Sequence, residues 1–400
     1  MSFAEVRFQP AAVRMLRAAV AGDRVAHAYV FVGPRGVGKG LAAREFAKLL
    51  MCESPRGQTA RSGEPGRAET VDPCDRCEHC RRIDRQVHPD LTWYRKEAGR
   101  NDFRMAIVRY DPNDPADVVM PVLDAVALTP MEARRKVIVL DDAELMNRNA
   151  ANALLKTLEE PSERTVLVLL CADAAELPGT ILSRCQWVRF GPLPEEFVAE
   201  KVGEVLAARA AKDDQEGRAP SPKRPGRAGD RGPQREISMD EIMYAARFAG
   251  GSIEQAARLL TTGLWRLKRQ LVEQLPAIDP AVALDMAEAI QAWGREVMKQ
   301  EHVRVDTPEG NAVRRWAARL GLAATASALG DAARLAAGAR EAGRLVNSDQ
   351  RLLIEALAGW SAEACGRAVA ILADGQSEID RYVHTELATE NALIQVSRLR

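Results

Sequence analysis

The chain has 400 residues, with 56 Lys plus Arg against 56 Asp plus Glu, and apolar residues make up 46% of it. This length suits two or three domains with real cores. A net charge of zero argues against a strongly basic, free-standing nucleic-acid binder. No apolar run approaches the ~20 residues of a membrane helix, and the first residues lack the apolar core of a signal peptide. We therefore expect a cytoplasmic protein that makes no membrane contact.

The first predicted elements are two helices on either side of a strand and a glycine-rich loop. Residues 10–22 have the apolar spacing of an amphipathic helix. AYVFVG, residues 28–33, is a short apolar run closed by Gly-Pro, which predicts a buried strand that enters a turn. Residues 41–51 then combine helical periodicity with good helix formers.

The loop between them, GPRGVGKG, follows the phosphate-loop pattern G-x-x-x-x-G-K-[ST] except at its last position. Gly33, Gly36 and Gly38 allow a phosphate to approach the backbone closely, and Lys39 supplies positive charge. A Ser or Thr in the next position would coordinate Mg²⁺, which Gly40 cannot do. The context of strand, loop and helix predicts the phosphate-loop fold. Whether the loop binds ATP and Mg²⁺ is left open by these residues.

A cysteine cluster follows an irregular, Gly/Pro/Ser/Arg-rich insertion at residues 53–73. Seven cysteines, an odd number, argue against a disulfide framework and favour thiols or metal ligation. Two-residue gaps let consecutive thiolates reach one ion, and four thiolates make a closed, structural zinc site. The predicted ligands are Cys52, Cys74, Cys77 and Cys80. His79 and His88 are alternative ligands, although His79 adjoins Cys80 and would crowd the same metal.

Two further apolar runs predict a parallel sheet. KVIVLDDAE, residues 136–144, and TVLVLLCAD, residues 165–173, read as buried strands, with a helix at 151–161 between them. Near-continuous apolar strands that alternate with helices indicate a parallel sheet covered on both faces. Asp141, at the end of the first run, has the position of a Mg²⁺-binding acid. Asp142 has the position of a glutamate that orients water, but its side chain is one methylene shorter.

The rest of the chain reads as helical. After Leu193 the composition shifts, and residues 212–236 are Pro/Gly/Arg-rich with almost no apolar residue, which predicts a disordered insertion. From residue 267 onward the chain is Ala/Leu-rich with helical spacing. We expect a helical C-terminal domain there.

The motifs together resemble those of clamp-loader subunits of the AAA+ superfamily. The matching segments are HAYVFVGPRGVGKG, CDRCEHC, KVIVLDDAELMNRNAANALLKTLEEP and LPGTILSRCQ, which occur in the family's order. The resemblance covers residues 1–195 well, 195–265 loosely, and the last third only as helical sequence. It implies an α/β AAA+ phosphate-loop domain at 1–193 with a zinc module at 52–80. It further implies a small helical lid at 194–266, with the insertion at about 212–236, and an all-α collar at 267–400.

This family contains an ATP-hydrolysing gamma/tau motor type and a delta-prime type that donates an arginine finger to a neighbouring motor subunit. The resemblance assigns the finger to Arg184, within the intact turn Ser183-Arg184-Cys185. An arginine finger is worth about 10³–10⁵ in rate where it has been characterised. Read without the family, Arg184 is one of many surface arginines.

Four departures from the motor pattern favour the delta-prime type. Besides Gly40 and Asp142, the sensor pair Thr-Thr is replaced by Cys171-Ala172. A sensor arginine after Gly-Ser is replaced by Glu254. The degenerate nucleotide site therefore comprises Gly33, Gly36, Gly38, Lys39, Gly40, Asp141 and Asp142, and we expect little or no intrinsic ATPase activity.

The resemblance also implies the partners: gamma/tau motor subunits, a delta subunit and, through the assembled DNA polymerase III clamp loader, the sliding clamp and primed DNA. Two alternatives remain at this point. One is a gamma/tau-type motor, since Lys39 and Asp141 are kept. The other is a free-standing zinc module that contacts DNA, against which the zero net charge weighs.

Overall fold

The computed structural model describes residues 3–57, 71–94, 122–146, 148–215, 237–305, 307–338, 345–381 and 384–399. The chain divides into two compact units, Met1–Pro194 and Glu195–Arg400. Each unit is described separately below. Within the described residues, no helix combines the length and the apolar character needed to cross a membrane.

The first unit is built on a five-stranded parallel sheet, and three of its strands are the apolar runs that predicted a parallel sheet. The strands lie in the order β4-β5-β6-β1-β7. Their bounds are β1 Ala28–Val32, β4 Leu91–Tyr94, β5 Lys136–Leu140, β6 Thr165–Cys171 and β7 Gln186–Arg189. A separate antiparallel pair joins β2 Arg56–Gly57 to β3 Val71–Asp72. Because all five strands run the same way, the loops after β1, β5 and β6 meet at one edge of the sheet.

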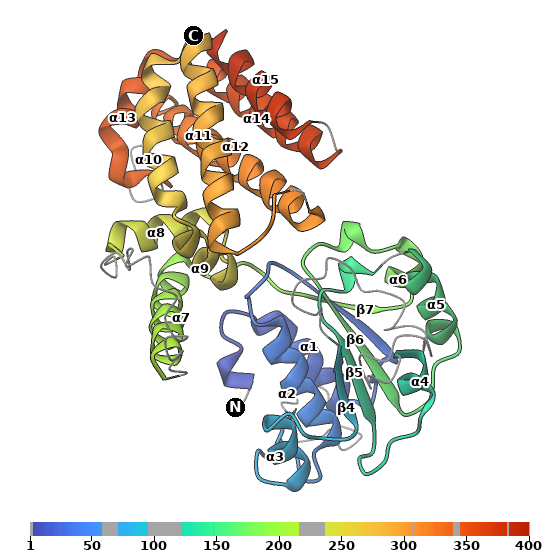
Figure 1. The fold of residues 1–400 in the computed structure, drawn as a ribbon. Helices are drawn as coiled ribbons and strands as arrows, with labels where there is room; N and C mark the ends of the chain where they lie inside the picture. Colours follow the sequence, from blue (N-terminus) through green and yellow to red (C-terminus); the bar gives the residue numbers. More distant parts are fainter. Residues whose placement is uncertain are drawn as a thin grey trace, which may run out of the picture. The chain divides into compact units, whose positions relative to one another are not determined.

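Helices cover both faces of this sheet (Figure 1). The bounds are α1 Pro10–Ala21, α2 Lys39–Met51, α3 Glu78–Asp84, α4 Val122–Ala127, α5 Arg148–Glu159 and α6 Gly179–Leu182. Strand β1 shows why both faces are apolar. Val30 packs into the core that it shares with α4, α5 and α6, whereas Tyr29 faces the other way and meets Phe46 of α2 edge-on, with ring centroids 5.0 Å apart. Short 3-10 helices lie at Phe3–Glu5, Ala143–Leu145 and Ala174–Glu176.

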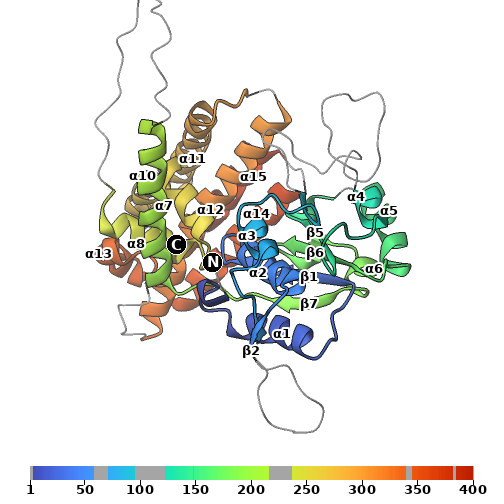
Figure 2. The same cartoon turned by 90° about the horizontal axis from the view of Figure 1, so that it is seen from below.

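The second unit is helical throughout its described residues, which agrees with the Ala/Leu-rich composition (Figures 1 and 2). Its helices are α7 Glu195–Gln215, α8 Met239–Phe248, α9 Ile253–Thr262, α10 Leu264–Gln274, α11 Pro280–Gln300, α12 Pro308–Ala336, α13 Arg351–Ala356, α14 Ala362–Asp380 and α15 Thr385–Ser397. Short 3-10 helices lie at Leu275–Ala277, Ser348–Gln350 and Leu357–Gly359.

The boundaries expected in this unit differ from those observed. Helix α7 continues to Gln215, so the first four residues of the insertion predicted at about 212–236 are helical. The reason is that this end of the insertion, Lys-Asp-Asp-Gln, contains no glycine or proline to stop a helix. The remainder, residues 216–236, lies outside the described residues. The expected division at residue 266 falls inside α10, and a lid and a collar within the unit stay a prediction.

Close packing joins the long helices of the second unit. A Cβ atom added at Gly321 of α12 would lie 2.5 Å from Cγ1 of Ile290 on α11, so only glycine allows the two helices this approach. A buried ion pair connects α10 to the 3-10 helix at Ser348–Gln350. The Nζ of Lys268 is fully buried between the rings of Tyr244 and Trp265 and donates to both carboxylate oxygens of Asp349, at 2.5 and 2.7 Å.

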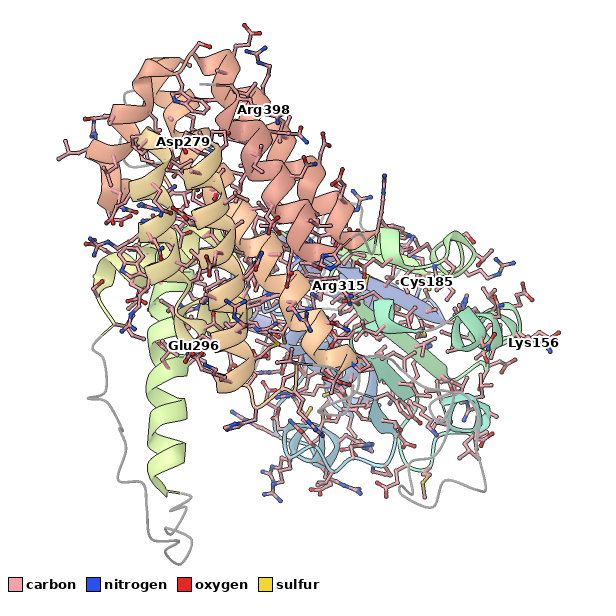
Figure 3. All side chains as sticks on the ribbon, turned by 45° about the horizontal axis from the view of Figure 1, so that its top comes forward. Lys156, Cys185, Asp279, Glu296, Arg315 and Arg398 are labelled. Carbon is pink, nitrogen blue, oxygen red and sulfur yellow. The ribbon has the colours of Figure 1, made fainter. Side chains whose placement is uncertain are left out.

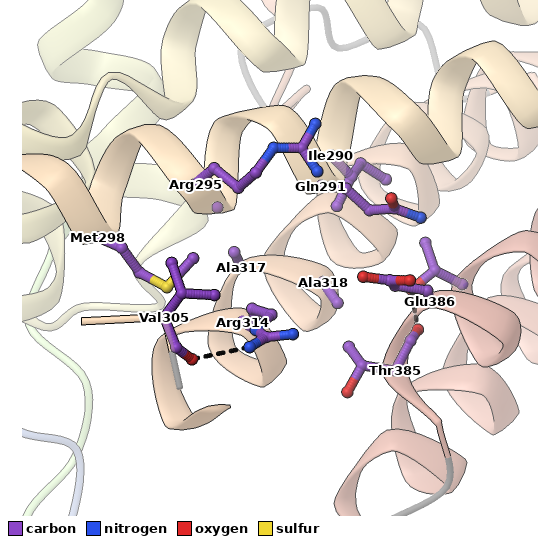
Figure 4. A pocket seen from close by; sticks show the side chains of 12 residues that line it. Ile290, Gln291, Arg295, Met298, Val305, Arg314, Ala317, Ala318, Thr385 and Glu386 are labelled. Atoms are coloured by element: carbon purple, nitrogen blue, oxygen red, sulfur yellow. Dashed lines mark hydrogen bonds between the residues drawn. The ribbon is translucent and has the colours of Figure 1, made fainter. Parts of the chain in front are cut away.

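A cavity of about 170 Å³ lies among α11, α12 and α15 (Figure 4). Its lining is mainly apolar, and the guanidinium of Arg314 donates to the Val305 carbonyl at 2.8 Å beside it. None of the residues singled out in the sequence lines this cavity.

Candidate functional site

The glycine loop connects β1 to α2 in a shape that requires its glycines. The φ angles of Gly36 and Gly38 are 76° and 99°, in the left-handed region that side chains disfavour. Gly33 lies against the end of β7, where an added Cβ would come within 2.3 Å of the Phe190 carbonyl oxygen. The structure therefore places a phosphate-type loop at the N-terminus of α2, where the sequence predicted it.

Lys39 is held in place by the loop itself. Its buried Nζ donates to the carbonyl oxygens of Gly33 and Pro34, at 2.5 and 2.8 Å. Burial lowers the pKa of Lys39, and the nearby carboxylate of Glu144 opposes that effect. An ammonium has three donors, and these two bonds use two of them. The loop thus anchors the lysine, and its role in phosphate binding stays a prediction.

The metal corner of the loop is the space between Gly40 and Asp141, where a phosphate loop would hold Mg²⁺. It contains a side chain that the sequence motif did not predict. The half-buried Trp93 of β4 places its ring beside Gly40, with Cζ2 and Cη2 3.6 and 3.8 Å from the position of an added Cβ. The Nε1 of the same ring donates to Oδ2 of Asp141 at 3.4 Å. One indole ring therefore lies beside Gly40, which lacks the hydroxyl, and bonds to Asp141, the predicted metal-binding acid.

The acids after β5 are tied to the loop by a second unpredicted residue, Arg35. Its guanidinium lies 2.9 Å from Oδ1 of Asp142 and 3.4 Å from Oε1 of Glu144. The backbone N–H of Ala172, after β6, also donates to this Glu144 oxygen at 3.3 Å. Burial raises the pKa of Glu144. The candidate nucleotide site is therefore a connected polar group in which Arg35, Trp93 and Glu144 were missed because the motif leaves their positions unspecified.

Arg184 lies apart from that group, on the surface. Its side chain is 38% exposed, and its guanidinium donates to Oε1 of Glu159, at the end of α5, at 2.9 Å. Ser183 donates from its hydroxyl to the Thr180 carbonyl at 3.0 Å. Cys185, labelled in Figure 3, is buried between α6 and β7, and burial raises its pKa to about 12. The turn thus exposes Ser183 and Arg184 at the domain surface and buries Cys185.

The four predicted cysteines come together. One sulfur atom from each lies within 4.8 Å of all the others: Cys52, Cys74, Cys77 and Cys80. Cys52 caps the C-terminus of α2, and Cys74 follows the β2–β3 pair. Cys77 caps the N-terminus of α3, and Cys80 lies in its first turn. Sulfurs about 3.8 Å apart are required by four Zn–S bonds of about 2.3 Å in a tetrahedron, and Sγ of Cys74 and Cys80 are 4.0 Å apart. The donor set therefore fits a zinc ion.

Backbone groups support the sulfurs. The N–H groups of Arg76 and Cys77 point at Sγ of Cys74. Although burial opposes it, their effect lowers the pKa of the Cys74 thiol to about 6. Burial raises the pKa of Cys52 and Cys80, so a bound cation would be needed to hold all four as thiolates.

The two histidines weighed as alternative ligands bond to each other instead. His79 Nδ1 and His88 Nε2 are 2.8 Å apart. The N–H of Asp90 donates to His88 Nδ1, so the hydrogen of neutral His88 lies on Nε2 and points at His79. The four cysteines form the candidate metal site without either histidine.

A family model and several known proteins match the first unit of this chain. A family model described as "DNA polymerase III, delta subunit" matches residues 8–194. The subunit delta′ of Bacillus subtilis is 32% identical over 194 residues, which are 48% of this chain and 51% of that protein. The subunit delta′ of Pseudomonas aeruginosa is 36% identical over 160 residues, 40% of this chain and 42% of that protein. The first unit is therefore similar to delta and delta′ subunits of DNA polymerase III.

The chain is also similar to tau subunits of DNA polymerase III. The tau subunit of Escherichia coli is 30% identical over 303 residues, 74% of this chain and 39% of that protein. The chain thus spans about half or less of the length of these relatives. A gamma-subunit-related structure from Thermotoga maritima covers 97% of this chain and 99% of its own, at 16% identity and a TM-score of 0.36. Identity alone does not separate the delta-prime from the gamma/tau type.

Proposed function

We propose that this chain is a delta-prime-type subunit of the DNA polymerase III clamp loader, with little or no ATPase activity of its own. The observation that carries the proposal is the contrast between two sites. The metal corner of the loop has glycine at position 40 and an indole against it, whereas Arg184 is exposed on the domain surface. The first arrangement disfavours hydrolysis in cis, and the second suits action in trans.

Arg184 would complete the ATP site of an adjacent motor subunit. In the single chain its guanidinium pairs with Glu159 and also donates to the Thr180 carbonyl at 3.1 Å. The side chains of Arg184 and Glu159 are 38% and 52% exposed. Exposed pairs of this kind contribute about 0–1 kcal/mol. Exchange of Glu159 for a γ-phosphate is therefore inexpensive, and the bidentate guanidinium geometry suits phosphate.

The proposed partners follow from the family. They are gamma/tau motor subunits and a delta subunit and, through the complex, the sliding clamp and primed DNA. The helical second unit is proposed to carry the contacts that assemble the complex. The cysteine site is proposed to bind a structural zinc ion through Cys52, Cys74, Cys77 and Cys80, because four protein ligands leave no open position for catalysis.

The test of the finger is Arg184→Ala in a reconstituted clamp loader. We expect the ATPase and clamp-loading rates to fall, by about 10³–10⁵-fold at the site that Arg184 completes. The complex should still assemble. Arg164→Ala is the matched control, because Arg164 is another exposed arginine of the same unit. Gel filtration of both complexes checks assembly. An unchanged rate in the Arg184 variant would refute the finger.

A gamma/tau-type motor is the second candidate, because Lys39 and Asp141 are kept and the E. coli tau match covers 74% of the chain. ATP hydrolysis by the purified chain with Mg²⁺, alone and with primed DNA, separates the two. The delta-prime proposal expects no turnover above background. Clear turnover that Lys39→Ala abolishes would establish the motor instead.

A further inference from the structure

The Mg²⁺-nucleotide that a phosphate loop implies does not fit the residues of this site. Mg²⁺ binds oxygens at about 2.0–2.1 Å in near-ideal octahedral geometry. In this loop the ion would lie between residue 40 and the acid after β5. Gly40 offers no oxygen there, and the other partner, Asp141, accepts a hydrogen bond from an indole.

The indole of Trp93 spans the two positions that would share the ion. Its six-membered ring faces Gly40, with Cζ2 3.6 Å from the added Cβ, and its Nε1 lies 3.4 Å from Oδ2 of Asp141. Two ligands of one Mg²⁺ lie at most about 4 Å apart, given bonds of about 2.1 Å. An aromatic N–H group donates a hydrogen bond and cannot coordinate a cation. The ring therefore occupies the place of the ion.

The rest of the loop has kept its form. Lys39 is fixed by the carbonyls of Gly33 and Pro34, and the left-handed glycines hold the backbone in a phosphate-loop turn. The misfit is thus local to one corner.

We propose that Trp93 is the residue that prevents Mg²⁺-nucleotide from binding to this loop. The missing hydroxyl at Gly40 is insufficient by itself to prevent that binding. This inference rests on the proposed function and deepens it, because it names the side chain that prevents nucleotide binding in this subunit. The geometry also permits a repair. The added Cβ at Gly40 meets the ring at ordinary contact distances, so serine fits the backbone at position 40.

The test measures Mg²⁺-dependent binding of a fluorescent ATP analogue, mant-ATP, by the full chain. Four proteins are compared: wild type, Gly40→Ser, Trp93→Phe and the double variant. Phenylalanine keeps the aromatic packing of β4 but lacks Nε1 and the outer ring atoms that face Gly40. We expect the double variant to bind about 10–100-fold more tightly than wild type, the range that changes around a metal site typically produce. EDTA, or an added Lys39→Ala, should abolish the gain.

Three outcomes would overturn the inference. The first is that wild type binds Mg²⁺-mant-ATP as tightly as the double variant does. The second is that Gly40→Ser alone recovers the full gain in affinity. The third is that the folded double variant gains no affinity. Circular dichroism and a thermal melt establish folding, and Trp93→Ala with Gly40→Ser replaces the double variant if that one does not fold. The function is tested separately. If the mant-ATP test fails but Arg184→Ala lowers the ATPase rate of the reconstituted complex, the delta-prime proposal stands. ATP turnover by the wild-type chain would refute the delta-prime proposal itself.

Discussion

Single buried charges in the first unit are stabilised by specific donors. Asp90, immediately before β4, is fully buried, and its carboxylate accepts from the backbone N–H groups of Met131, Glu132 and Ala133 at 2.6, 2.9 and 2.8 Å. Burial would raise the pKa of this carboxyl, but the three N–H bonds outweigh it and lower the pKa. One side chain therefore fixes the segment that leads into β5, the strand that carries Asp141 at its end.

Replacement of Asp90 by asparagine is expected to destabilise the first unit by about 1–3 kcal/mol at pH 7, because an amide NH₂ would face backbone donors. A carboxyl whose pKa is lowered on folding stabilises above its unfolded pKa of about 3.9, and this stability is lost as the pH falls through the folded pKa. The gap between wild type and Asp90→Asn should therefore be full above about pH 5 and narrow below about pH 4.

Urea unfolding between pH 7 and pH 3 measures this gap. The exposed Asp124 of α4 provides the control, and Asp124→Asn should differ little from wild type at any pH. A gap that keeps its size at acid pH would contradict the assignment.

At the scale of elements, helix packing in the second unit depends on glycine at one position and not at another of the same helix. An added Cβ at Gly321 would lie 2.5–2.7 Å from Ile290, whereas at Gly330 it would meet nothing within 4 Å. Both glycines belong to α12. Helix propensity favours alanine equally at the two positions, so any difference between them reports packing against α11.

Gly321→Ala should lower the free energy of unfolding of the second unit by about 1–3 kcal/mol, the usual cost of overpacking. Gly330→Ala should leave it unchanged or raise it by up to about 1 kcal/mol. Chemical denaturation of the full chain, followed by circular dichroism at the helical signal, measures both. Equal effects of the two substitutions would show that α11 and α12 are not closely packed in solution.

For the whole molecule, the cysteine site and a buried ion cluster attach the module at 52–84 to the helix that follows the glycine loop. Lys48 of α2 is fully buried and lies within 4.0 Å of carboxylate oxygens from Glu45, Asp75 and Asp84. Asp75 adjoins Cys74, and Asp84 ends α3. Loss of a metal from the cysteines would therefore also disturb the partners of a buried lysine, which is costly.

The purified chain is expected to contain one zinc ion, measured by mass spectrometry of the element. Cys80→Ser should lose the metal and lower the thermal midpoint of the first unit, since a ligand present at about a thousandfold its Kd contributes about 4 kcal/mol. Cys365→Ala changes a buried cysteine outside the cluster and should retain the zinc. A zinc-free chain with full stability would exclude a structural metal.

Local patterns allowed much of the fold to be predicted. Buried strands β1, β5 and β6 contain continuous runs of four to six apolar residues and were identified from them. Strands β4 and β7 have only four residues each, some of them half-buried or exposed, and no period distinguishes them from loops. Trp93 was missed with β4, because its role depends on the strand that carries it.

Residue spacing was enough to identify the glycine loop, the cysteine cluster and the acids after β5, because each is a local pattern whose chemistry depends on near neighbours in the chain. The partners of those groups became known only from the folded chain. Trp93 reaches Asp141, Arg35 reaches Asp142, and Arg184 reaches Glu159. Each pair joins residues far apart in sequence, so the contact depends on strand order and helix packing, which only the folded chain sets.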